Sequence, residues 1–411
     1  MGQAIGVATR ADPTAIERVL TEGYLTQPMI MARGIWGLGR GVLTANFEDL
    51  TLKRGELTTG AYGEGYVDRR HPHAYFHELL AGLEGETRGL AGSLFAGRGF
   101  VPFGSDDPMV RPFEKYPVNH HLAQVLERLV AIVAVRRGPV IAEVGTFNGD
   151  EPLSATSAPA WDRFGDSWST RLTLLPARGF ELSASYADVE SPEIVHGDGL
   201  DQRKKSVVAR YNRATANART YALAEWAHTD EHYRGTVVAP LSSVLAEGAY
   251  CRGGAYAGLR FERTDRPEEE TTLDPFRTPR PANHVSSLGV SRWTTVTFSL
   301  SPLVVSSGVF SGRPFIEVAR IHAAPGNPAG LFNADFRYGK SRMWMFSAGL
   351  QLRAGAMHDR MGRYGVADPA DTSYRRGNSL HSPASHQMTP SHAASSTRHV
   401  MFHKPVNRCS V

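Results

Sequence analysis

Long apolar runs are missing from this sequence of 411 residues. No stretch approaches the roughly 18 consecutive apolar residues that a membrane-spanning helix requires, so a bundle of transmembrane helices is excluded. The mean hydropathy of -0.29 is ordinary for a soluble protein. It is equally ordinary for a β-barrel, because a barrel alternates apolar and polar residues along each strand and so keeps the average low.

The sequence also has few cysteines and little net charge. Cys251 and Cys409 are the only two cysteines and lie far apart, so the sequence predicts neither a disulfide framework nor a zinc cluster. The 45 lysines and arginines nearly balance 41 aspartates and glutamates and are scattered, which argues against nucleic acid as a partner. No nucleophile elbow and no dinucleotide fingerprint occurs. We therefore predict no enzyme and no cofactor.

What the sequence does have is period-two alternation from about residue 28 to 354. The segment 178–188 is the clearest case, with Phe180 and Leu182 on one face and Glu181 and Ser183 on the other. Such alternation is typical of β-strands with one apolar and one polar face. In a soluble sandwich the apolar face would meet a second sheet, whereas in a barrel it meets lipid.

The length and spacing of these segments favour the barrel. They run for about nine to eleven residues, which matches a tilted transmembrane strand. Short turns alternate with long polar connections such as 191–203 and 264–283. We therefore predict an all-β fold, an antiparallel transmembrane β-barrel of roughly 12 to 16 strands with long external loops and short periplasmic turns.

The two ends of the chain break this pattern. Residues 12–22 suggest a short capped helix, so we assign 1–27 to an N-terminal leader or short helix and 28–354 to the barrel. Beyond residue 354 the alternation stops and the composition becomes rich in Ser, His, Pro and Ala. We expect 355–411 to be a disordered or peripheral C-terminal tail.

Three histidines and a glutamate lie close together at His71, His73, His77 and Glu78. Imidazole and carboxylate ligands suit zinc, copper, nickel or iron. A helix over 73–80 would place His73 and His77 one turn apart on one face, where they could bind one ion. The alternative is a polar loop in which the histidines hydrogen-bond to the backbone. A metal-binding β-protein therefore stays open as a second function.

A glycine-rich segment near residue 100 precedes two aspartates. It lacks the Gly-Lys-Ser/Thr ending of a phosphate-binding loop. We interpret it as the end of a strand that turns into a constriction loop or a short helix. Its candidate residues are Arg98, Pro102, Phe103, Asp106 and Asp107.

Charged residues occupy the polar faces of the expected strands. In a barrel these faces line the lumen, where fixed charges set ion preference through the local potential. In a soluble protein they would form only a solvated face. The candidate pore-lining residues are Arg171, Arg210, Arg260, Arg353, Glu143, Glu181 and Glu262.

Two short motifs carry a resemblance to a known family. Residues 97–104 read GRGFVPFG, and residues 144–149 read VGTFNG in an alternating strand. In these motifs the chain resembles the phosphate-selective porin family of the outer membrane. The resemblance implies diffusion of small ions or solutes through a barrel that can form a homotrimer. It also implies that inward arginines such as Arg171, Arg210, Arg260 and Arg353 favour anions.

We therefore predict a porin-like channel of the bacterial outer membrane for passive diffusion of small ions or solutes. Its partners would be the lipid bilayer, the solutes and further copies of the chain in a homotrimer. A soluble all-β hydrolase or sugar-binding sandwich is a third alternative, although no pair of carboxylates on one concave face identifies it.

Overall fold

The computed structural model describes residues 2–11, 20–51, 74–114, 116–152, 154–192, 197, 199–215, 217–268, 289–326, 330–355 and 360–369. Its strands are β1 (Gly2–Ala11), β2 (Leu20–Trp36), β3 (Gly39–Asn46), β4 (Phe76–Thr87), β5 (Leu90–Gly99), β6 (Arg128–Arg137), β7 (Val140–Phe147), β8 (Ser167–Leu174), β9 (Phe180–Val189), β10 (Asp201–Ala214), β11 (Ala218–Tyr233), β12 (Thr236–Arg252), β13 (Ala255–Glu268), β14 (Gly289–Ser301), β15 (Val305–Ser307), β16 (Phe310–Pro325) and β17 (Arg342–Ala354). The short helices are α1 (Glu48–Thr51), η1 (Pro108–Val110), α2 (His120–Ala123), η2 (Trp161–Arg163), α3 (Ala334–Tyr338) and η4 (Gly365–Ala367).

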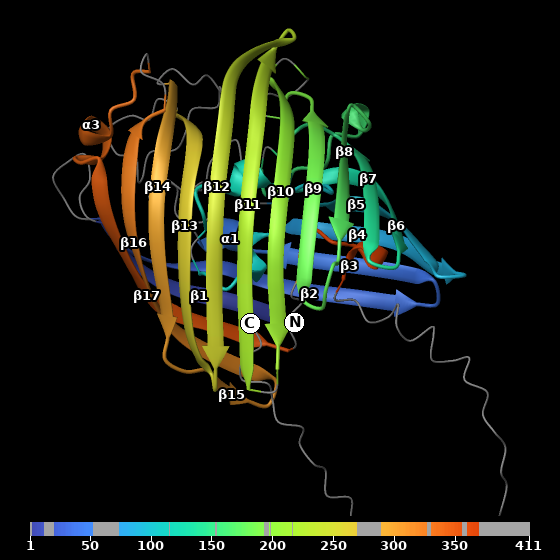
Figure 1. The fold of residues 1–411 in the computed structure, drawn as a ribbon, viewed down its shortest axis with the longest axis horizontal. Coiled ribbons are helices and arrows are strands. Elements are labelled where there is room, and N and C mark those ends of the chain that lie inside the picture. The colour runs from blue at the N-terminus through green and yellow to red at the C-terminus, as the bar shows by residue number, and fades with distance from the viewer. Residues whose placement is uncertain are drawn as a thin grey trace, which may run out of the picture.

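The strands form one closed antiparallel barrel (Figure 1). β1 pairs with β2 on one side and with β17 on the other, from Gly2 opposite Ala354 to Ala11 opposite Met345. The sheet contains 17 strands, but β14 and β15 both pair with β16 and share one place in the barrel wall. Sixteen positions therefore surround the lumen, within the range that the sequence predicts.

Alternation along the strands separates an apolar exterior from a polar interior. In β8, the side chain of Leu172 is 55% exposed while that of Arg171 is 1% exposed. The neighbouring strands repeat this arrangement, with Leu182 outside and Glu181 inside. An apolar outer band on a closed barrel is the arrangement that lipid requires, because no backbone polar group is left unpaired at an edge. The predicted transmembrane β-barrel is confirmed.

The two ends of the barrel differ in their connections. At one end, here called the short-turn end, β4 ends at Thr87 and β5 begins at Leu90. At the opposite long-loop end, β5 ends at Gly99 and β6 begins only at Arg128. α3 lies at the long-loop end and β15 at the short-turn end, at the top and bottom of Figure 1. This asymmetry is the predicted one of long external loops and short periplasmic turns.

The core lies inside the lumen rather than between two sheets. The connection between β5 and β6, residues 100–127, folds inward, and we call it the inserted loop. Its side chains Phe100, Phe103 and Met109 pack with Phe95 of β5 in a buried cluster. Tyr364 from the segment after β17 joins the same cluster. The soluble sandwich alternative is wrong, since a sandwich needs two facing sheets and these strands form one closed sheet.

The assignment of residues 1–27 to a leader or short helix is wrong, because β1 and the first part of β2 are barrel strands. β1 carries Ile5 and Val7 inward, where they pack on Phe315 of β16. The sequence signal was weak because β1 consists mainly of small residues. The closing strand is nonetheless required, since an open edge cannot face lipid. Residues 12–19, the centre of the expected helix, lie outside the described residues.

The expectation of a peripheral tail after residue 354 is wrong for residues 360–369. This segment, which we call the lumenal segment, lies inside the barrel, and Val366 and Ala367 pack on Ala91, Ala134 and Ile141. It is folded because the lumen offers it both apolar contacts and carboxylate partners. Residues 370–411 lie outside the described residues.

No helix among the described residues has the length and apolar character needed to cross a membrane.

Candidate functional site

The inserted loop is shaped by a left-handed glycine and by capping contacts. Gly104 has a φ of +64°, and a Cβ atom there would collide with the carbonyl oxygen of Ala123. The Asp107 carboxylate caps η1 by accepting a hydrogen bond from the Met109 backbone N–H at 2.8 Å. The Val101 N–H donates to the carbonyl oxygen of Val125 at 3.1 Å and so ties the two arms of the loop together. These contacts hold the loop across the lumen.

Arg111 of the inserted loop reaches the far wall of the barrel. Its Nη2 donates to Ser105 Oγ at 2.6 Å, and its guanidinium lies 3.8 Å from Glu225 and 3.7 Å from Glu247. Burial would lower the pKa of Arg111, but the charges of Glu247 and Glu225 raise it well above its ordinary value. Arg111 is therefore a fixed positive charge between β11 and β12.

The neighbouring wall strand β13 adds two of the predicted pore-lining residues. Arg260 Nε donates to Glu247 Oε2 at 2.8 Å, and its guanidinium lies 4.3 Å from the ring centroid of Phe113. Glu262 accepts a hydrogen bond from the Val118 N–H at 2.7 Å. We call the resulting group the constriction belt, and it comprises Arg111, Glu225, Glu247, Arg260 and Glu262.

Two cavities lie on opposite sides of the constriction belt along the same wall, β10 to β13. The larger is at the long-loop end and is lined by residues that include Lys204, Glu231 and Asp265. The smaller is at the short-turn end and is lined by residues that include Arg219 and Tyr256. The buried residues of the constriction belt therefore separate the two cavities along this wall.

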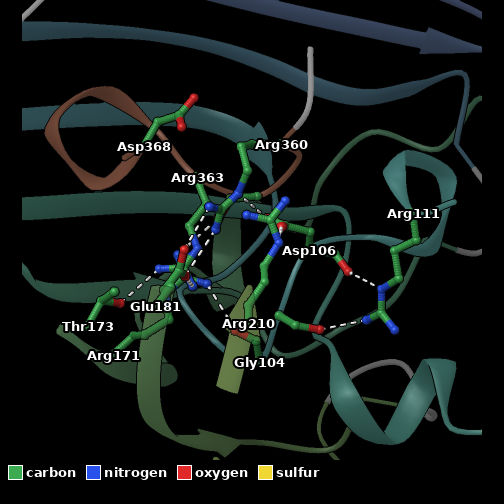
Figure 2. Close-up of polar contacts among 12 residues, drawn as sticks. Gly104, Asp106, Arg111, Arg171, Thr173, Glu181, Arg210, Arg360, Arg363 and Asp368 are labelled. Atoms are coloured by element: carbon green, nitrogen blue, oxygen red, sulfur yellow. Dashed lines mark hydrogen bonds and ion pairs between the residues drawn. The ribbon is translucent and has the colours of Figure 1, made fainter. Parts of the chain in front are cut away.

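On the adjoining part of the wall, Arg171 and Glu143 form a two-pronged ion pair across β7 and β8. The distances are 2.6 and 2.7 Å, and both side chains are buried. Glu181 of β9 accepts hydrogen bonds from Arg360 at 2.7 and 3.1 Å and from Arg363 at 2.8 Å. Figure 2 shows both guanidinium groups directed at Glu181. These arginines come from the lumenal segment.

All seven candidate pore-lining residues are directed to the inner side of the barrel. Arg171, Glu143 and Glu181 lie together, and Arg260 and Glu262 belong to the constriction belt. Arg210 Nε lies 3.4 Å from Asp106 Oδ2 and so connects β10 to the inserted loop. Arg353 is separate from both groups and donates to Gln3 Oε1 of β1 at 3.1 Å. Their role in conduction remains a prediction.

The five candidate constriction residues divide into two sets. Four of them are buried in the inserted loop, in agreement with the sequence-based interpretation of this segment as a loop: Pro102, Phe103, Asp106 and Asp107. Arg98 instead belongs to β5, one residue before its end, and donates to the Ser157 carbonyl oxygen at 3.0 Å. The tip of the loop at Arg111 makes the contact with the far wall.

The metal-binding alternative does not fit the described residues. His77 and Glu78 belong to β4, not to a helix, and a β-bulge opposite Thr44 turns both inward. His77 pairs with Glu127 and Asn46, while Glu78 accepts from Thr44 at 2.5 Å. No group of three or more potential ligands occurs in the part of the chain that the structure describes. His71 and His73 lie outside it.

Sequence reasoning did not select Arg360, Arg363, Tyr364 or Glu225 as site residues. The first three lie beyond the last alternating strand, where the sequence has no periodic signal. Glu225 shares the inner face of β11 with Leu223 and Ala227, while Trp226 faces outward, so alternation of polarity along this strand gave no signal for it.

Comparison with known proteins identifies the fold. No protein-family model and no curated protein sequence matches the chain. Among solved structures, the anion-selective porin from Comamonas acidovorans is 10% identical with a TM-score of 0.51, over 85% of this chain and 97% of that one. The Salmonella typhi OmpF complex with daunomycin is 9% identical with a TM-score of 0.48, over 85% and 97%. The likeness to the anion-selective porin, together with the closed barrel, shows that the chain has the fold of outer-membrane porins.

Proposed function

We propose that this protein is an outer-membrane channel for passive diffusion of small ions or solutes. The observation that carries the proposal is the pair of cavities at opposite ends of the β10 to β13 wall, with the constriction belt between them. A solute that passes from the larger cavity to the smaller one would meet apolar side chains such as Leu122 and Leu241 as well as the charged groups of the constriction belt. Closed barrels with apolar exteriors and polar interiors provide such aqueous paths across lipid.

We further propose a modest preference for cations. The constriction belt holds two guanidinium groups, of Arg111 and Arg260, and three carboxylates, of Glu225, Glu247 and Glu262. Fixed charges at a narrow point select ions of opposite sign. The resemblance to phosphate-selective porins is therefore not extended to a phosphate preference. A homotrimer also stays a proposal, to be tested by the mass of the detergent-solubilised protein.

The decisive variant is Arg111→Gln, which removes the positive charge that the inserted loop carries to the far wall. In planar bilayers under a KCl gradient, the reversal potential should move further toward that of K⁺, because Glu225 and Glu247 lose a counter-charge. Arg137→Gln is the matched control, since Arg137 is exposed at the short-turn end. Equal reversal potentials for the wild type and Arg111→Gln would place the permeation path elsewhere.

A further inference from the structure

The lumenal segment occupies a site on the inner wall that is built mainly from carboxylates. Arg360 Nε donates to Asp106 Oδ1 of the inserted loop at 2.8 Å, in addition to its two bonds to Glu181. Arg363 Nη1 donates to Glu143 at 3.2 Å, in addition to its bond to Glu181. We call Asp106, Glu143 and Glu181 the carboxylate cluster. Its three acids receive both guanidinium groups of the segment.

Glu181 depends on the lumenal segment more than the other two acids do. Glu143 also pairs with Arg171, and Asp106 lies close to Arg210. The hydrogen bonds found for the Glu181 carboxylate among the described residues all come from Arg360 and Arg363. Withdrawal of the segment would therefore remove these hydrogen bonds and leave space for a soluble cation beside Glu181, with Arg210, directly opposite on β10, as a remaining cationic neighbour.

The lumenal segment is attached to the barrel in a way that allows it to leave. It is not a strand of the sheet, and every hydrogen bond that joins it to the barrel within the described ranges uses a side chain. Its apolar contacts come from Val366 and Ala367 on the β5 to β7 wall and from Met361 and Tyr364 in the buried cluster of the inserted loop, so its release would expose these four side chains. Its removal would break no strand pairing. The segment follows β17, which ends at the short-turn end.

The segment also fills the part of the lumen that the two cavities leave out. η4 contacts β4, β5, β6 and β7, whereas both cavities are lined by β10 to β13. Tyr364 donates to Glu78 at 2.9 Å and accepts from the Phe100 N–H at 2.9 Å, so the segment also braces the start of the inserted loop. The segment thus packs, together with the inserted loop, against the β4 to β7 side of the barrel interior.

We propose that residues 360–369 are a displaceable stopper, and that the carboxylate cluster beneath it is a binding site for soluble guanidinium or amine cations. In the closed state Arg360 and Arg363 are the ligands of this site. A soluble cation that takes their place releases the segment toward the short-turn end and opens the β4 to β9 side of the lumen. The inference rests on the proposed channel function, but displacement can be measured without conduction.

The first test measures conductance in planar bilayers. The double variant Arg360→Gln with Arg363→Gln should raise the single-channel conductance by about twofold, because a second part of the cross-section becomes open. Replacement of residues 360–369 by a Gly/Ser segment of equal length should give the same rise. The matched control is Arg137→Gln with Arg178→Gln, which removes two exposed charges at the short-turn end and should leave conductance unchanged.

The same bilayers test the cation site. Guanidinium chloride at a non-denaturing concentration should block the KCl current of the Gly/Ser variant, and the further change Glu181→Gln should abolish that block. Sodium chloride at equal ionic strength should not block. If conductance rises but guanidinium gives no block that depends on Glu181, the proposed cation site is wrong. If both stopper variants fold and conduct like the wild type, the proposal that residues 360–369 act as a stopper is wrong.

The second test does not depend on conduction. Val366→Cys places a thiol in the buried contact with Ala91 and Ile141, and a maleimide should label it slowly in the otherwise complete protein. Guanidinium should accelerate labelling, while sodium should not. Arg178→Cys, at an exposed turn, should react quickly in both salts. If guanidinium accelerates labelling but the barrel never conducts, the proposed channel function is wrong and the cation site is supported. If labelling of the Val366→Cys thiol stays slow in guanidinium, the proposed displacement of the lumenal segment is wrong.

Discussion

The ion pair between Arg171 and Glu143 offers the sharpest test of how the barrel interior is held together. The two residues lie directly opposite each other on β8 and β7. Arg171 also donates to the carbonyl oxygens of Gly104 at 3.4 Å and Gly362 at 3.0 Å. One side chain therefore connects the wall, the inserted loop and the lumenal segment.

Arg171→Met keeps much of the side-chain volume and leaves Glu143 with Arg363 as its remaining cationic partner. Removal of one member of a buried pair usually costs about 3–5 kcal/mol. Since Arg363 stays at 3.2 Å from Glu143, we expect a loss near the lower limit, about 3 kcal/mol in the free energy of unfolding. Adding Glu143→Leu removes the stranded carboxylate, so the double variant should recover most of that loss.

The free energies can be measured by urea titration of the protein in lipid vesicles, followed by tryptophan fluorescence. Arg203→Met is the matched control, because Arg203 and Asp188 are also opposite on paired strands but are far more exposed, with 3.9 Å between Nε and Oδ2. It should cost less than about 1 kcal/mol. The reasoning fails if Arg171→Met costs no more than Arg203→Met, or if the double variant is less stable than Arg171→Met alone.

Two further predictions concern the inserted loop. Gly104→Ala should destabilise the barrel more than Gly138→Ala in the same urea assay; both glycines have positive φ, but only at Gly104 would the new methyl group strike a backbone atom, the Ala123 oxygen. Equal losses of stability in the two variants would contradict the close approach of a Cβ atom at position 104 to the Ala123 oxygen. Burial would raise the pKa of Asp107, but the hydrogen bond and charge of His120 hold it below its ordinary value. Asp107 therefore stabilises the fold above pH about 4 and loses this contribution as the pH falls through its lowered pKa. Asp107→Asn should flatten the acid side of the stability profile, and an unchanged profile would contradict this.

The barrel wall could be predicted from the sequence because alternation is local. In β9, Leu182 and Glu181 differ so strongly in polarity that the outer and inner faces can be read directly. β1 could not be recognised in this way, since Gly2–Ala11 alternates among small residues and becomes a strand by completing the closed sheet. The bulge that turns both His77 and Glu78 inward likewise depends on the register with β3.

The filling of the lumen could not be predicted, because it depends on contacts between distant parts of the chain. Asp106 and Arg360 are far apart in sequence and meet only after the barrel closes. Leu223 and Glu225 both face inward on β11, so polarity alone does not identify the inner face where loops pack against it. The inward charges were selected as candidates, but the sequence did not indicate which of them pair, such as Arg171 with Glu143.

Single-channel recording of the purified, detergent-solubilised protein in planar bilayers tests the central claim most directly. A channel with a path between the two lumenal cavities should give discrete, stepwise increases in current as molecules insert. A preparation whose barrel is folded in the bilayer and gives no current steps would contradict the account. So would a stable, lipid-free monomer in plain buffer, because the apolar outer band would then have no need of lipid.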